Sequence, residues 1–115
     1  MSLSRNQILE ANDLPKKEVK VPEWNGSVFI RTLTGEERDR FEADYAEMKE
    51  KKAIGNFRAK FLALAICDEE GKPLFTQEDV NSLGKKSARA LQRLFNIATT
   101  MSGIGEKDLE EMVKN

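Results

Sequence analysis

The side chains that most often carry out catalysis near neutral pH are scarce in this chain, which has no histidine and one cysteine, Cys67. Without histidine, the commonest general base is missing and no Ser-His or Cys-His nucleophile pair can form. A single cysteine also excludes an intrachain disulfide and a site with several thiolates. Cys67 ends the apolar run 61–66, which favours a buried and unreactive thiol. The sequence therefore predicts a protein that is not an enzyme and has no cofactor.

Two glycine-containing segments have residue types found in calcium-binding and phosphate-binding loops, but their residues are not spaced as those loops require. Segment 68–73 is acidic, but its glycine falls fourth, whereas a calcium loop of the EF-hand type needs glycine sixth. In segment 102–107 a glutamate separates the second glycine from the lysine, which a phosphate-binding loop does not allow. Neighbouring carboxylates such as Glu36 and Glu37 lie on polar faces, whereas an acid–base pair needs one buried member. We predict no metal site and no catalytic residue.

A basic cluster points to a different function. It lies in the segment that begins the longest amphipathic pattern and consists of Lys85, Lys86, Arg89 and Arg93. Cations on a helix preceded by a short turn (residues 82–84) are found in small DNA-binding proteins. However, the net charge of the chain is −1, whereas nucleic-acid binders usually have a basic excess. A small regulatory DNA-binding protein that uses this helix face, from Lys85 to Arg93, is the alternative function.

Aromatic and apolar side chains give a candidate surface for a protein partner. Trp24 is the sole tryptophan, a residue enriched in binding hot spots, although at a hairpin turn it also serves as a packing residue. With Phe29 it forms the expected hairpin edge. A short last helix adds an apolar side. The partner-binding residues that we predict are Trp24, Phe29, Leu109, Met112 and Val113.

The elements that position these residues fit one domain over residues 1–115, because domains typically hold about 100–150 residues. Charged residues make up 34% and hydrophobic residues 39% of the chain, which is typical of a soluble globular protein. No apolar stretch approaches the ~20 residues of a membrane span, and the first residues have no signal-peptide core. We expect no membrane association and a cytoplasmic location.

The N-terminal third has the pattern of a β-hairpin. Residues 16–21 alternate polar and apolar side chains, and residues 27–33 are rich in β-branched and aromatic side chains. Between them, Asn25 and Gly26 are the pair that best fits a type I′ turn. Residues 1–15 form either a loose arm or one short helix, with Ile8, Leu9 and Leu14 as its anchors.

Helical signals follow the hairpin. Thr34 and Glu37 have the spacing of a capping box, which predicts a helix to about residue 52. Residues 57–67 are apolar almost all round and predict a central helix, with a buried strand as the alternative. Further helices are expected over 76–83, 85–102 and 106–114, and residues 105–115 are expected to be a mobile C-terminal helix. The predicted fold class is α+β, mostly α, with an N-terminal β-hairpin followed by four or five helices.

The order of these segments resembles a known family. The segments that carry the resemblance are NQILEANDL (6–14), VKVPEWNG (19–26), RTLTGEERDRFE (31–42), DEEGKPLF (68–75), LGKKSA (83–88) and MSG (101–103). Together they cover nearly the whole chain and are similar to the tail assembly chaperones of long, non-contractile-tailed bacteriophages and prophages.

The resemblance implies a non-enzymatic function in virion morphogenesis. Members of this family coat the tape-measure protein and recruit tail-tube protein subunits around it, and they are absent from the mature virion. The resemblance also implies a bacterial host cytoplasm, protein–protein interaction as the activity, a possible homo-oligomer and, in many members, a longer frameshifted form. Amphipathic helices and a charged surface are consistent with binding helical partners.

Overall fold

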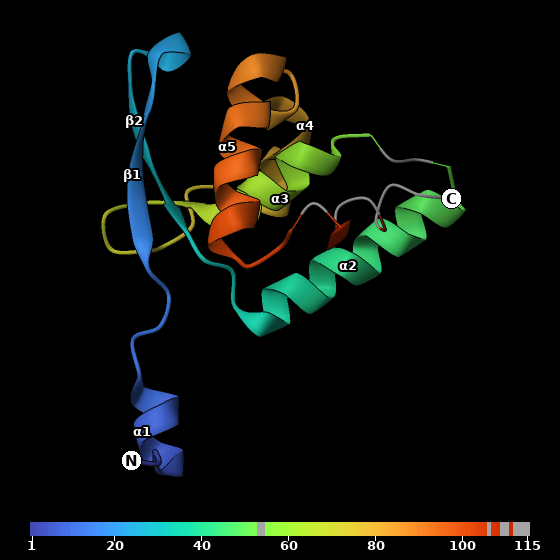
Figure 1. Ribbon diagram of the computed structural model, residues 1–115. Coiled ribbons are helices and arrows are strands. Elements are labelled where there is room, and N and C mark those ends of the chain that lie inside the picture. The colour runs from blue at the N-terminus through green and yellow to red at the C-terminus, as the bar shows by residue number, and fades with distance from the viewer. Residues whose placement is uncertain (53–54, 106, 109–110, 112–115) are drawn as a thin grey trace.

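A small antiparallel sheet and a group of helices make up the fold, as the computed structural model in Figure 1 shows. The structure describes residues 1–52, 55–105, 107, 108 and 111. In the sheet, β1 (Lys16–Val21), β2 (Gly26–Arg31) and β3 (Ile66–Cys67) lie in that order. Helices that follow the hairpin cover one face of the sheet, and Val19, Val21 and Ile30 point from this face into the core.

The hairpin was predicted correctly, but the type of its turn was not. Instead of a two-residue turn, the 3-10 helix η1 (Pro22–Trp24) follows β1, and Asn25 then takes a left-handed conformation with φ of 54°. The Asn25 N–H donates to the carbonyl of Pro22 at 3.1 Å. Proline fixes a φ that suits the start of a helical turn, and asparagine tolerates the left-handed region, so the two residues together favour this longer connection.

The first long helix confirms the capping signal. In α2 (Gly35–Glu50) the Thr34 hydroxyl accepts the Glu37 N–H at 3.0 Å, and the Glu37 carboxylate accepts the Thr34 N–H at 2.9 Å. Phe41 and Tyr45 are buried and Met48 is half-buried, so these residues, spaced i, i+4 and i+7, form an apolar stripe along the helix. The remaining face of α2 is charged. The helix thus contacts the core along one narrow side.

The central segment is part helix and part strand. Residues 57–67 form α3 (Phe57–Ala65) and then β3, which pairs antiparallel with β2 through Ile30 and Phe29. Phe61 lies in the centre of the core and is fully buried. Its ring centroid is 4.9 Å from that of Phe41 and 5.5 Å from that of Phe95. This aromatic cluster joins α2, α3 and the last long helix.

The last long helix begins later than predicted. Its N-cap is Ser87, whose hydroxyl accepts the Ala90 N–H at 3.2 Å, so α5 runs over Ala88–Met101 and not from Lys85. Serine is a favoured N-cap residue because its hydroxyl accepts a backbone N–H of the first helical turn, so the helix begins after Ser87 and the two lysines lie in the preceding turn.

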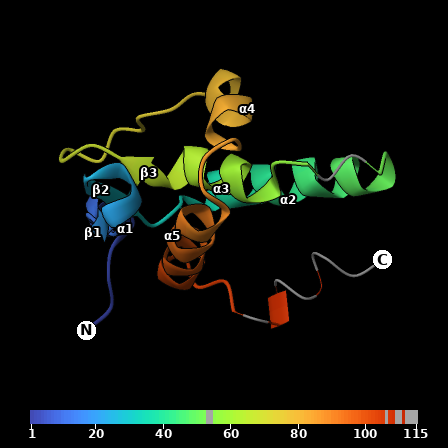
Figure 2. The same cartoon turned by 90° about the horizontal axis from the view of Figure 1, so that it is seen from above.

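The predicted short helix over 76–83 is present as η2 (Gln77–Asp79) and α4 (Val80–Leu83). Figure 2 shows α3, α4 and α5 grouped beside the hairpin.

The N-terminal residues form the predicted short helix, α1 (Arg5–Glu10), with a complete capping box between Ser4 and Gln7. However, Ile8 and Leu9 do not anchor it: they are 57% and 66% exposed. In Figure 1, α1 extends beyond the open end of the hairpin, away from the other helices. Leu74, in the loop before η2, is also exposed, whereas its neighbour Phe75 packs against the core. The overall class, α+β and mostly α, is as predicted.

Candidate functional site

An apolar cleft lies beside the tip of the hairpin. We call it the Trp24 cleft; its volume is about 410 Å³ and its lining residues are Trp24, Phe75, Asp79, Ser82, Leu83 and Lys86. Trp24 comes from η1, Phe75 from the loop before η2, and Leu83 from the end of α4. Trp24 and Phe75 are only partly buried while packing against the core, so their outer surfaces form the cleft. Both interpretations of Trp24, packing residue and exposed aromatic, therefore hold in part.

Phe29 does not join Trp24. Val28 packs against the core and Ile30 is buried in it, so strand alternation places Phe29 on the opposite face of the sheet. There it is half-buried and pairs across the sheet with Glu18 and Cys67. The expected continuous hairpin edge made of Trp24 and Phe29 is thus wrong, because the two side chains belong to opposite faces.

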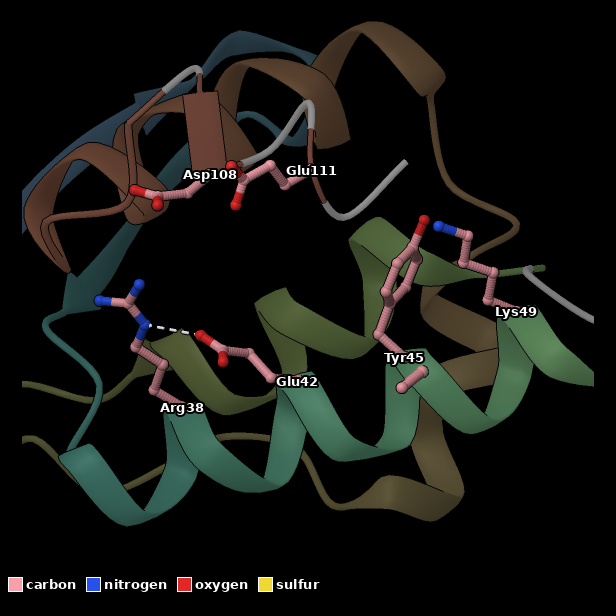
Figure 3. Close-up of a pocket in the computed structure, with 7 residues that line it drawn as sticks. Arg38, Glu42, Tyr45, Lys49, Asp108 and Glu111 are labelled. Carbon is pink, nitrogen blue, oxygen red and sulfur yellow. Dashed lines mark hydrogen bonds and ion pairs between the residues drawn. The ribbon is translucent and has the colours of Figure 1, made fainter. Parts of the chain in front are cut away.

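A second hollow, which we call the α2 groove, lies between the charged side of α2 and the C-terminal segment (Figure 3). Its volume is about 350 Å³, and its lining residues are Arg38, Glu42, Tyr45, Ala46, Lys49, Asp108 and Glu111. The Arg38 Nε donates to the Glu42 carboxylate at 2.9 Å along the helix. The groove thus presents cations from α2 and carboxylates from both sides, as a polar contact surface does.

Tyr45 gives the α2 groove a buried polar atom. Its side chain is 3% exposed, and its hydroxyl has no hydrogen-bond partner among the described residues. The Tyr45 ring packs 4.8 Å from the Phe57 ring, which holds it in place between the groove and the aromatic core. A buried hydroxyl without a partner is costly, so this position favours an additional polar contact.

A bidentate ion pair fixes the hairpin to α2. The Arg31 guanidinium donates to both oxygens of the Glu37 carboxylate, at 2.8 and 2.7 Å, and Arg31 is 6% exposed. These hydrogen bonds lower the pKa of Glu37, against the opposing effect of its burial. The same carboxylate caps α2 through Thr34, so one side chain joins helix start and sheet. The pair is structural: it orients α2 against the hairpin.

A second bidentate pair changes the interpretation of the basic cluster. Arg93 of α5 donates to both oxygens of Glu23 at the hairpin tip, at 3.0 and 2.5 Å, and this contact lowers the pKa of Glu23. Lys85 and Lys86 lie before the helix start, and only Arg89 and Arg93 are on α5. The predicted continuous basic helix face is therefore wrong: one of its four cations is paired with a carboxylate, and two are not helical.

The single thiol is buried, as expected, and the acidic segment 68–73 forms a turn. Cys67 is buried in β3, and burial raises the pKa of its thiol. Asp68 accepts the N–H groups of Glu70 and Lys72, which closes the turn around Gly71.

Across the described part of the chain, no three histidine, cysteine or carboxylate side chains lie close enough together to bind a metal ion. Within the same residues, no helix is long and apolar enough to cross a membrane.

The other predicted partner residues, Leu109, Met112 and Val113, lie outside the residues that the structure describes. Sequence reasoning missed Phe75, Asp79 and Leu83 as neighbours of Trp24. Their signal in the sequence is weak, because all three lie about 50 or more residues from Trp24 along the chain and no local pattern links them to it. Only the antiparallel return of segment 73–74 beside β3 brings it to the hairpin tip.

Comparisons with known proteins agree with this architecture. The profile of a family described as "Phage tail assembly chaperone" matches residues 4–115. A solved structure of the tail assembly chaperone of bacteriophage HK97 superposes with a TM-score of 0.61 at 22% identity, covering 84% of this chain and 94% of that chain. At that identity the likeness shows the fold. No curated protein matches the sequence significantly. Because the family profile covers nearly its whole length, the chain belongs to the phage tail assembly chaperone family.

Proposed function

We propose that the chain binds the tape-measure protein of a phage or prophage tail and recruits tail-tube subunits around it, without catalysing a reaction. The observation that carries this proposal is the family match over residues 4–115. It agrees with the chemistry of the chain, which lacks histidine and has its one thiol buried. The family itself implies a non-enzymatic role.

The two hollows suit a helical partner. The Trp24 cleft offers aromatic and aliphatic surface with a carboxylate and an ammonium group in its lining, so an apolar side chain of an amphipathic helix fits it. The α2 groove offers charged groups and the buried Tyr45 hydroxyl for polar contacts. A long helical protein that exposes apolar stripes before assembly needs both kinds of contact to stay soluble.

A pull-down tests the proposal directly. Tagged chain is expressed together with the neighbouring tail genes, washed at moderate salt, and the bound proteins are identified by mass spectrometry. The expected result is recovery of a long helical protein together with a tail-tube subunit. Trp24→Asp should reduce the recovery at least tenfold, because a charge would enter the apolar cleft. The matched control Asn25→Asp changes charge by the same amount beside the cleft and should leave recovery unchanged.

A second outcome would favour the alternative function. If only nucleic acid co-elutes, and only at low salt, the basic residues around the start of α5 are the functional surface, because phosphate contacts weaken steeply with salt. We do not favour it, because Arg93 is held by Glu23. The proposed place of action is the cytoplasm of the bacterial host, before the chain is lost from the finished virion.

A further inference from the structure

The first ten residues present apolar surface that the fold leaves uncovered. None of the six residues of α1, all of which the structure describes, is buried. Large apolar side chains that are more than half exposed concentrate there. Among the described residues they are Met1, Leu3, Ile8, Leu9 and Leu74. A six-residue helix is too short to be stable alone in water, even with its capping box. Its apolar face therefore favours a binding partner.

The face of α1 has a definite chemistry. Arg5, Ile8 and Leu9 are spaced i, i+3 and i+4, so they share one side of the helix. This side offers two adjacent aliphatic groups with a guanidinium one turn toward the N-terminus. The N-terminal end of a helix is also partly positive and its C-terminal end partly negative. A complementary surface would be apolar, with an anion at one end and a cation at the other.

The Trp24 cleft of the same chain contains each of these groups in its lining. Its apolar lining is Trp24, Phe75 and Leu83, and its charged groups are Asp79 and Lys86. The Asp79 Oδ2 accepts the Thr76 N–H at 2.9 Å, while its other oxygen has no partner within the described residues. Asp79 thus suits Arg5 and the positive end of α1, and Lys86 suits the carbonyl end.

The position of α1 decides which copy it meets. The cleft is lined by Trp24, which belongs to the closed tip of the hairpin. Figure 1 shows α1 beyond the open end of the hairpin. A six-residue strand spans about 20 Å, so the two surfaces of one molecule lie at opposite ends of the hairpin. We propose that α1 of one copy docks in the Trp24 cleft of a second copy, with Ile8 and Leu9 on Trp24 and Phe75, and Arg5 beside Asp79.

This contact joins two different surfaces of the same chain. Such a heterologous contact leaves a free cleft on one copy and a free helix on the other, so it adds further copies instead of stopping at a dimer. The contact area of one short helix is small, which predicts weak association that depends on protein concentration. The inference concerns the purified chain without tail partners; a tail-protein helix that enters the Trp24 cleft would compete with α1 for the same surface.

Cysteine cross-linking tests the contact. Ile8→Cys and Ser82→Cys place one thiol on α1 and one at the cleft, and the native Cys67 is buried. Mixing the two single variants under mild oxidation should give a cross-linked dimer that contains one of each. In the double variant we expect a ladder of covalent species. The inference is overturned if the mixture gives no such dimer, if Ile8→Cys cross-links only to itself, or if the double variant closes only within one chain.

A charge substitution gives a second readout without cross-linking. Ile8→Asp with Leu9→Asp should weaken concentration-dependent association at least tenfold in analytical ultracentrifugation, while the melting temperature stays unchanged because neither residue is buried. Gln7→Glu with Ala11→Glu adds the same charge to α1 and the residue after it, away from the side that carries Arg5, Ile8 and Leu9. Glutamate at residue 7 keeps the capping box, so this control should associate like the wild type. Equal weakening by both pairs would overturn the inference.

Discussion

The helices α1 and α5 start in the same way and differ in everything that follows. Each begins at a serine whose hydroxyl accepts a backbone N–H three residues later, Ser4 for α1 and Ser87 for α5. Yet α5 runs for 14 residues and buries six of them, whereas α1 runs for six and buries none. Local capping fixes where a helix begins, but burial of one face decides whether it belongs to the core. The same apolar residue types thus stabilise the fold in α5 and remain available for binding in α1.

The largest expected effect comes from truncating the buried face of α5. Leu94 is fully buried, so Leu94→Ala should lower the free energy of unfolding by about 2–5 kcal/mol. The matched change in α1, Leu9→Ala, removes the same atoms from a side chain that is 66% exposed and should leave stability unchanged. Urea denaturation followed by circular dichroism measures both. A comparable loss in Leu9→Ala would show that α1 is part of the core.

The two arginine–glutamate pairs extend the comparison to the hairpin. Glu37→Ala leaves the buried Arg31 guanidinium without its carboxylate, and we expect a loss of about 2 kcal/mol in the same denaturation experiment. Glu23→Ala removes an equally bidentate pair at an exposed position, where solvent screens the charges, so stability should barely change. Equal losses would contradict the assignment of only the first pair as structural.

The Arg31–Glu37 pair should make the free energy of unfolding depend on pH in the acid range. Because Arg31 holds the pKa of Glu37 below its ordinary value of about 4.3, the carboxylate contributes stability at neutral pH. That contribution is fully present above the ordinary pKa and is lost as pH falls through the lowered one. We therefore expect wild type to lose more stability than Glu37→Ala between pH 5 and pH 2 in denaturation curves. Parallel pH profiles would argue against a lowered Glu37 pKa.

Removing the two serine caps gives the smallest effects and the sharpest contrast. Ser87→Ala should cost about 1 kcal/mol of global stability, because α5 unfolds only with the core. Ser4→Ala should leave the unfolding free energy unchanged while lowering the helical signal slightly, since α1 can fray alone. Amide hydrogen exchange separates the two: protection should fall across the core in the first variant and only over residues 5–10 in the second.

The parts of the fold that local chemistry controls were predictable. The capping box of Thr34 and Glu37 and the alternating pattern of residues 16–21 led to α2 and β1. The end of α3 was not, because Ile66 and Cys67 leave the helix to pair with β2, a choice that tertiary contacts make. The Trp24 cleft was half predicted: Trp24 was chosen for its residue type, but its neighbours Phe75 and Leu83 come from segments that only the fold brings together.

The corrections have the same origin. Phe29 was grouped with Trp24 because both are aromatic and near the turn, but the strand period places Phe29 on the other face. Arg93 was grouped with the lysines before α5, but its partner Glu23 is 70 residues away along the chain. Long-range contacts of this kind leave no trace in a local pattern.

The central claim is that this chain binds a helical tail protein through apolar surface. The most direct test is to purify the complex with the long helical protein from the neighbouring tail genes and to measure its dissociation constant at 0.1 M and 0.5 M salt. Apolar burial predicts a dissociation constant that changes less than tenfold over this range. A loss of binding by several orders of magnitude, or binding to duplex DNA that is tighter than to the protein, would contradict the account.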